Sequence, residues 1–158
     1  EHADWNFISA DGVNRPEILA GHVARLREAT ALSGRRCGAL GLVLVIADET
    51  DEKAMAKWEH YVAGTDHEAL AWRDFQAAQD TGAEAHSTVG RYLRSDRLPN
   101  TLMRFVGSYA TIARLLDECA AMPGLEGMML AFDDFTTGPN LFGERIQPLM
   151  RSRAHVGR

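Results

Sequence analysis

The segment that decides the fold runs from Gly107 to His155 and reads GSYATIARLLDECAAMPGLEGMMLAFDDFTTGPNLFGERIQPLMRSRAH. Its first part predicts a helix, because Ser108 can cap the first turn and apolar residues then recur at helical spacing: Ile112, Leu115, Leu116 and Cys119. Pro123-Gly124 ends this helix. Gly127 to Phe132 is continuously apolar, which predicts a strand covered on both faces. A loop and a second helix are expected to follow.

Two carboxylates, Asp133 and Asp134, stand where this predicted strand leaves the core. In parallel α/β proteins the carboxyl end of a strand is the place where ligands bind. Adjacent side chains on extended backbone point to opposite sides, so at most one carboxylate faces a cleft while the other serves a turn or an ion pair. Phe132 is a candidate for packing against a flat ring, with a core aromatic as the alternative.

Two further strands are predicted upstream. Asp4 to Ser9 is rich in aromatic and β-branched residues, and Ala39 to Ala47 is an apolar run typical of a parallel strand buried on both faces. Helices with recognisable caps separate these strands: a capping box formed by Asn14 and Glu17, then Thr50 and Asp66 as single N-caps. The alternation predicts an α/β fold built from βαβ units with right-handed crossovers.

Polar residues on the first two strands complete the set of site candidates. Asp48 and Glu49 follow the long strand and can either reach a site or serve the helix cap at Thr50. Asn6 is polar within an apolar strand, and a buried amide requires partners, either structural ones or a ligand. The residues expected to face a pocket are therefore Asn6, Asp48, Phe132 and Asp133.

Composition disfavours several other classes of protein. A net charge of −5 argues against a nucleic-acid binder, which normally presents a basic face. No apolar run approaches the roughly 20 residues that span a bilayer, so no membrane association is expected. Two cysteines and scattered histidines, with His60 and His67 seven positions apart, do not form a metal site. A reducing cytoplasm is the expected location.

Three segments together resemble a known family. They are Gly107 to His155, Leu44 to Trp72 (LVIADETDEKAMAKWEHYVAGTDHEALAW) and Ala3 to Pro16 (ADWNFISADGVNRP). They are similar to the C-terminal part of the flavin-dependent pyrimidine monooxygenases of uracil degradation, within the bacterial-luciferase-like superfamily. The resemblance covers nearly the whole chain except Asp80 to Arg104. It implies that residues 1–158 are the last three βα units of a (β/α)8 TIM barrel, with an irregular excursion at about 80–104.

The resemblance also implies the chemistry. It suggests reduced FMN as cofactor, held mostly by residues upstream of this chain, together with O2, a small pyrimidine-like substrate and a flavin reductase as partner. No catalytic residue, flavin-binding residue or metal ligand is assigned within the chain itself.

Length leaves the activity of this chain open. A complete barrel takes about 250 residues, and the 158 residues here would leave hydrophobic sheet edges unpaired. The expected partners are a missing N-terminal half of the barrel or another copy across those edges, the latter giving a homo-oligomer. The alternative to part of a monooxygenase is a truncated, non-catalytic homologue or assembly module that lacks the flavin site. A small flavodoxin-like domain ranks last, because it needs about five strands.

Overall fold

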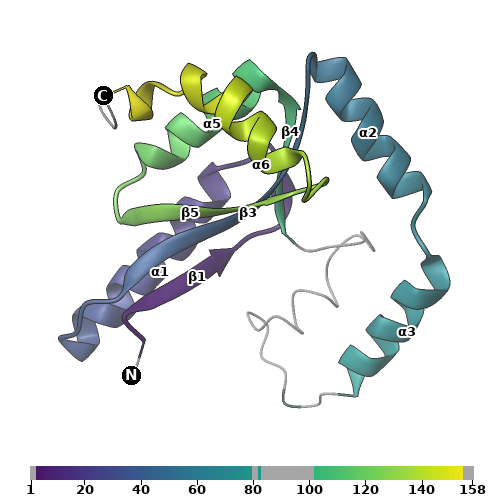
Figure 1. Ribbon diagram of the computed structural model, residues 1–158. Helices are drawn as coiled ribbons and strands as arrows, with labels where there is room; N and C mark the ends of the chain where they lie inside the picture. The colour runs from purple at the N-terminus through teal and green to yellow at the C-terminus, as the bar shows by residue number, and fades with distance from the viewer. Residues whose placement is uncertain (1–2, 80–81, 83–101, 155–158) are drawn as a thin grey trace.

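Strands and helices alternate along the chain (Figure 1). The computed structural model describes residues 3–79, 82 and 102–154. In chain order the strands and helices are β1 (Trp5–Ser9), β2 (Gly12–Val13), α1 (Glu17–Ser33), β3 (Gly38–Asp48), α2 (Asp51–Ala63), α3 (His67–Ala78), β4 (Met103–Ser108), α5 (Tyr109–Ala120), β5 (Leu125–Phe132) and α6 (Gly138–Leu141). A π-helical turn (Phe142–Ile146) and two 3₁₀ turns (Gln147–Leu149 and Arg151–Arg153) follow.

The sheet is parallel throughout and is centred on β3. Strand β5 pairs along one edge of β3, from Ala39 to Val45. The other edge is shared, because β1 pairs with the first half of β3 and β4 pairs with the second half. Strand β2 adds to the outer edge of β4. The predicted α/β fold with a parallel sheet is confirmed, and β1, β3 and β5 lie side by side in chain order.

Strands β2 and β4 were not predicted. Strand β4, MRFVGS, carries a charged residue, Arg104, in the middle of its apolar run. Arg104 is only 1% exposed, because its guanidinium lies 2.5 Å from Asp11 Oδ1 and 5.0 Å from the centre of the Trp58 ring. Most of the predicted excursion at 80–104 lies outside the described residues, and Met103 and Arg104 at its end belong to this strand.

One face of the sheet, here called the packed face, is covered by α1 and α5. Val43, Val45, Met103 and Phe105 lie on it and are fully buried. They pack against apolar residues of both helices and of the π-helical turn: Leu19, Val23, Ile112, Leu115, Leu116 and Ile146. Burial of this kind contributes about 25 cal/mol per Å² of apolar surface, so this layer is the principal stabilising core.

The opposite face, here called the open face, is covered only at one end. Alternation and register place Phe7, Leu40, Leu42 and Met129 on it. Helix α2 covers its carboxyl end, where Ile46, Ala54 and Val106 form a second small cluster. Further along, Trp5, Phe7 and Met129 are 47%, 55% and 53% exposed. The prediction that β3 and β5 are covered on both faces is therefore wrong within the described chain, because α2 is the one described helix that packs on this side.

The predicted capping box at Asn14 and Glu17 is also wrong. Helix α1 begins after Pro16 without a side-chain cap. Asn14 adopts a φ of 54°, and its amide exchanges two hydrogen bonds of 2.7 Å with the backbone of Val106. The side chain thereby continues the pairing between β2 and β4.

Other predicted helix ends are confirmed. Thr50, Asp66 and Ser108 each accept a hydrogen bond from the backbone amide three residues on. The second helix of the Gly107–His155 segment is shorter than expected, since α6 has four residues and gives way to π and 3₁₀ turns. Pro148 accounts for this break, because proline lacks the amide hydrogen and clashes with the carbonyl one turn earlier. Among the described helices, none is long and apolar enough to cross a membrane.

Candidate functional site

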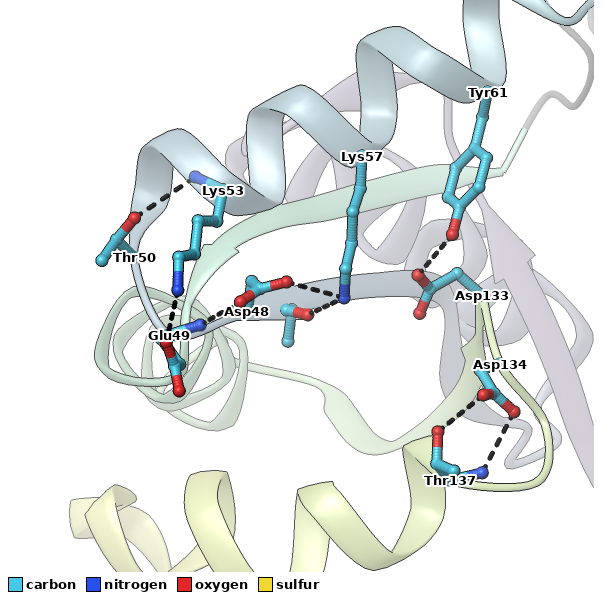
Figure 2. Close-up of polar contacts among 10 residues, drawn as sticks. Asp48, Glu49, Thr50, Lys53, Lys57, Tyr61, Asp133, Asp134 and Thr137 are labelled. Atoms are coloured by element: carbon cyan, nitrogen blue, oxygen red, sulfur yellow. Dashed lines mark hydrogen bonds and ion pairs between the residues drawn. The ribbon is translucent and has the colours of Figure 1, made fainter.

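A cavity lies where the carboxyl ends of β3 and β5 meet α2 and α6. Its volume is about 210 Å³. Polar side chains from all of these regions border it, as Figure 2 shows for Lys57 and Tyr61 of α2 and for Asp133, Asp134 and Thr137. The remaining lining residues are Val45, Ala47, Phe132, Gly138, Leu141 and Ile146.

The apolar wall of this cavity is fixed by close packing. Phe132 lies at the end of β5, and its ring is tilted against that of Phe142 with the centres 6.0 Å apart. Gly138 is buried directly against it, since a Cβ at this position would lie 2.5 Å from the Phe132 Cβ. Only glycine allows the chain to approach so closely, so this residue sets the position of the wall.

Asp48 beside the cavity is occupied by structural contacts. Its Oδ2 lies 3.0 Å from Lys57 Nζ, and its Oδ1 accepts from the Glu49 amide at 2.7 Å. Lys57 Nζ also donates to the Ala47 carbonyl at 2.9 Å. The Glu49 amide and then the Lys57 ammonium lower the pKa of Asp48, so this carboxyl stays ionised and bound to its neighbours.

Asp134 is likewise occupied by a turn. Its Oδ1 accepts from the amides of Thr136 and Thr137, and its Oδ2 accepts from the Thr137 hydroxyl at 2.7 Å. The Thr137 hydroxyl, followed by the Thr137 and Thr136 amides, lowers the pKa of this carboxyl. Asp134 therefore shapes the connection from β5 to α6, as turn-forming aspartates do.

Asp133 differs from both. Its Oδ2 accepts from the Tyr61 hydroxyl at 2.9 Å, and within the described chain no other side chain donates to this carboxylate. Although Tyr61 is 40% exposed, partial desolvation of its hydroxyl raises its pKa to about 12, and the hydrogen bond to Asp133 adds to this effect. The phenol therefore remains a donor at neutral pH, and it holds Asp133 in place while one carboxylate oxygen stays available.

The structure brings some of the predicted site residues together and separates others. Phe132 and Asp133 line the cavity, and Asp48 lies beside it through Lys57. Asn6 does not join them, because it lies on β1 with an exposed side chain. The expected buried amide is therefore wrong. Contact of any of these residues with a cofactor or substrate stays a prediction.

Two lining residues, Lys57 and Tyr61, were not found from the sequence. They are four residues apart on α2 and so lie on one face of that helix. Their position on the helix that directly follows β3 was the available signal. In the described ranges, no group of three or more histidine, cysteine, aspartate or glutamate side chains could hold a metal ion.

Comparison with known proteins identifies close relatives. The chain is 53% identical over 156 residues to the pyrimidine monooxygenase RutA of Variovorax paradoxus strain S110, covering 98% of this chain and 42% of that protein. It is 51% identical over 157 residues to the pyrimidine monooxygenase RutA of Cronobacter sakazakii, covering 99% of this chain and 46% of that protein. The chain thus spans less than half the length of these curated relatives. No protein-family model matches it.

Solved structures share the fold at much lower identity. A riboflavin lyase (RcaE) structure with modified FMN and riboflavin superposes with a TM-score of 0.68 at 18% identity, covering 97% of this chain and 39% of that one. DmoA from Hyphomicrobium sulfonivorans gives a TM-score of 0.65 at 19% identity, covering 96% and 38%. These neighbours share the α/β fold of this chain over nearly its whole length. Over nearly all of its own length, the chain is a homologue of the pyrimidine monooxygenases RutA.

Proposed function

We propose that this chain is the C-terminal part of an FMN-dependent monooxygenase that inserts oxygen from O2 into a pyrimidine or a similar small ring. The observation that carries the proposal is the 53% identity over 156 residues to a pyrimidine monooxygenase. The match extends over 156 residues and therefore includes the loops and the strand ends, which are the parts of a fold that carry function.

The pairing of the strands supports the proposal that this chain is part of a larger barrel. Strands β1 and β5 pair in parallel with opposite edges of β3, as neighbouring strands of a (β/α)8 barrel do, and β4, which precedes β5 in the chain, extends the edge that β1 begins. We propose that β1, β3 and β5 are its last three strands and that the open face, with Trp5, Phe7 and Met129, looks into the barrel. The rest of the barrel would then cover these half-exposed side chains. A homo-oligomer formed across the sheet edges is the other arrangement, and it would pair the edge strands.

The residues around the cavity do not fit FMN. Its 210 Å³ falls below the roughly 300–1,000 Å³ of sites for drug-sized ligands, whereas FMN combines a three-ring system with a ribityl phosphate. The cation that lines it, Lys57, is already bound to Asp48 and to the Ala47 carbonyl. Flavin binding is therefore assigned to parts of the enzyme beyond these residues. The reduced flavin, supplied by a flavin reductase in the cytoplasm, would activate O2 there.

A chimeric enzyme tests this proposal. The matched segment of the Variovorax paradoxus relative, 42% of its length, is replaced by this chain. The purified chimera receives uracil, O2 and FMN reduced by a flavin reductase, with the parent enzyme as the positive control. Conversion of uracil by the chimera is the expected result. A chimera that folds and binds FMN but leaves uracil unchanged would overturn the proposal and favour a non-catalytic module.

A further inference from the structure

The six methionines of the chain differ sharply in their access to solvent. All six lie within the described residues, and Met129 is the only exposed one, with 53% of its surface accessible. Met103 is completely buried in the core of the packed face. The other four are partly buried: Met55, Met122, Met128 and Met150. A reagent in solution therefore reaches the side chain of Met129 most readily.

Met128 and Met129 are neighbours on β5 and form a matched pair. Because side chains alternate along a strand, the two lie on opposite faces of the sheet. The sulfur of Met128 lies against Gly41 on the packed face, where a Cβ on that glycine would be only 2.5 Å from Sδ. Met129 lies beside Leu42 on the open face, in the part that no described helix covers. The two residues thus share strand and chemistry and differ in the face on which they lie.

The thioether gives Met129 a chemistry that the apolar side chains around it lack. Hydrogen peroxide converts methionine to the sulfoxide, a reaction that needs direct access to the sulfur. The sulfur attacks one oxygen of the peroxide, so that an S–O bond forms as the O–O bond breaks, and the departing hydroxide takes the proton of the transferred oxygen and leaves as water. The sulfur is oxidised by two electrons and the peroxide is reduced. The product is a polar side chain where an apolar one stood.

We propose that Met129 is a site of oxidation by hydrogen peroxide, and that its sulfoxide weakens the covering of the open face. The covering by the rest of a barrel, and the reduction of O2 as a source of the peroxide, rest on the proposed function. A sulfoxide enclosed there without a hydrogen-bond donor carries the cost of an unsatisfied polar group. The 158-residue chain itself should stay folded, because a side chain that is already half in water contributes little to its core.

Peptide mapping by mass spectrometry tests the site in the chain itself, after limited treatment with hydrogen peroxide. In the folded chain, Met129 should be oxidised at least about tenfold faster than Met103, and also faster than Met128. In urea, where unfolding exposes every methionine, these differences should disappear. Equal rates for Met128 and Met129 in the folded chain would overturn the proposal, and so would faster oxidation of any other methionine. A chain oxidised at Met129 alone should keep the urea midpoint of the untreated chain, and a lower midpoint would contradict the assignment of Met129 to the open face.

Two replacements in the chimera test the effect on the covering of the open face. Met129→Gln places a polar side chain of similar length at the site, whereas Met129→Leu keeps an apolar one. The glutamine variant should melt several degrees below the leucine variant. Leu149→Gln is the matched control, because Leu149 is equally exposed, at 52%, but lies in the 3₁₀ turn that packs against α5, so its melting temperature should not change. Equal melting temperatures for the two Met129 variants would overturn this effect of the sulfoxide.

The oxidation test is independent of the test of the proposed function. If the chimera oxidises uracil but Met129 in the chain reacts no faster than Met103, the monooxygenase proposal stands and the oxidation site fails. If Met129 reacts first but the chimera is inactive, the oxidation site stands and the monooxygenase proposal fails.

Discussion

The two faces of the sheet are built from the same strands but differ sharply in burial. On the packed face, Val43, Val45 and Phe105 are completely inaccessible. On the open face, Trp5, Phe7 and Met129 remain about half exposed. Both sets are apolar, so the difference comes from the helices: α1 and α5 cover one face, while α2 covers only the end of the other. An apolar sequence thus specifies a surface that can be buried. Whether that surface is buried depends on the helices that pack against it.

Substitution of one phenylalanine on each face gives the largest expected difference. Phe105→Ala on the packed face should lower the free energy of unfolding by about 3–5 kcal/mol, because it removes a buried ring and leaves a cavity. Phe7→Ala on the open face should cost less than about 1 kcal/mol, because 55% of its surface is already in water. Urea denaturation of both variants measures the difference. Equal losses would mean that the open face is covered in solution, for instance by a second copy.

The second prediction concerns the buried Arg104, which lies at the end of the open face that α2 covers. Asp11→Asn removes a carboxylate that pairs with this guanidinium and should cost about 2–3 kcal/mol, because the buried cation loses a negatively charged partner. Arg104→Met removes the charge itself and should cost less, since the remaining carboxylate is 38% exposed and can hydrate. Denaturation at neutral pH ranks the two variants. The reverse order would show that packing of Arg104 against Trp58 outweighs its charge.

The same residues show which parts of the fold can be predicted from the sequence. Strands β1, β3 and β5 are visible because each is a continuous apolar or aromatic run. Strand β4 is hidden because Arg104 looks like a surface residue until Asp11, 93 positions away, is known to neutralise it. Asn14 has the spacing of a helix cap, but its amide binds Val106, which is 92 positions away. The local sequence pattern predicts strands and helices. Contacts between residues far apart in the sequence form only in the assembled sheet, so the pattern does not predict them.

The candidate site can likewise be predicted only in part from the sequence. Phe132 and Asp133 could be placed at a strand end from the sequence, because the strand itself is evident there. Lys57 and Tyr61 could not, since their approach to β3 and β5 depends on how α2 packs across the sheet. Asn6 does not carry the expected buried amide, because it lies near the amino end of β1, where its side chain is exposed although Ile8 on the same face of the strand is buried.

Two helix caps provide a smaller and more local comparison. Thr50 caps α2 on the open face, and Ser108 caps α5 on the packed face. Replacement of either by alanine should cost about 1 kcal/mol of helix stability. Amide hydrogen exchange should locate the effects differently: Ser108→Ala lowers protection across the core, whereas Thr50→Ala lowers it mainly within α2. Core-wide loss in Thr50→Ala would indicate that α2 folds as one unit with the packed face.

The smallest expected effect is a loss of stability at acid pH, through a carboxyl group of the helix α5 that covers the packed face. Asp117 of α5 accepts hydrogen bonds of 2.9 Å from the amides of Arg151 and Ser152 and so holds the last 3₁₀ turn. Burial alone would raise the pKa of this carboxyl, but its hydrogen bonds with Ser152 and Arg151 outweigh burial and lower the pKa. A lowered folded-state pKa contributes stability above the unfolded value of about 3.9, and that stability is lost as the pH falls through the folded value.

Asp117→Asn should therefore destabilise the chain by about 0.5–1 kcal/mol at pH 7 and by less at pH 3, which is below the unfolded value of about 3.9, so that part of this contribution is already lost. Denaturation curves at the two pH values measure the change. Glu118→Gln is the control, since this neighbouring carboxylate is exposed and pairs with Arg114 one turn earlier. An equal loss at both pH values would assign the role of Asp117 to packing. A smaller loss at pH 3 would show that the charged carboxylate fastens the C-terminal turn to the packed face, a link for which the open face has no described counterpart.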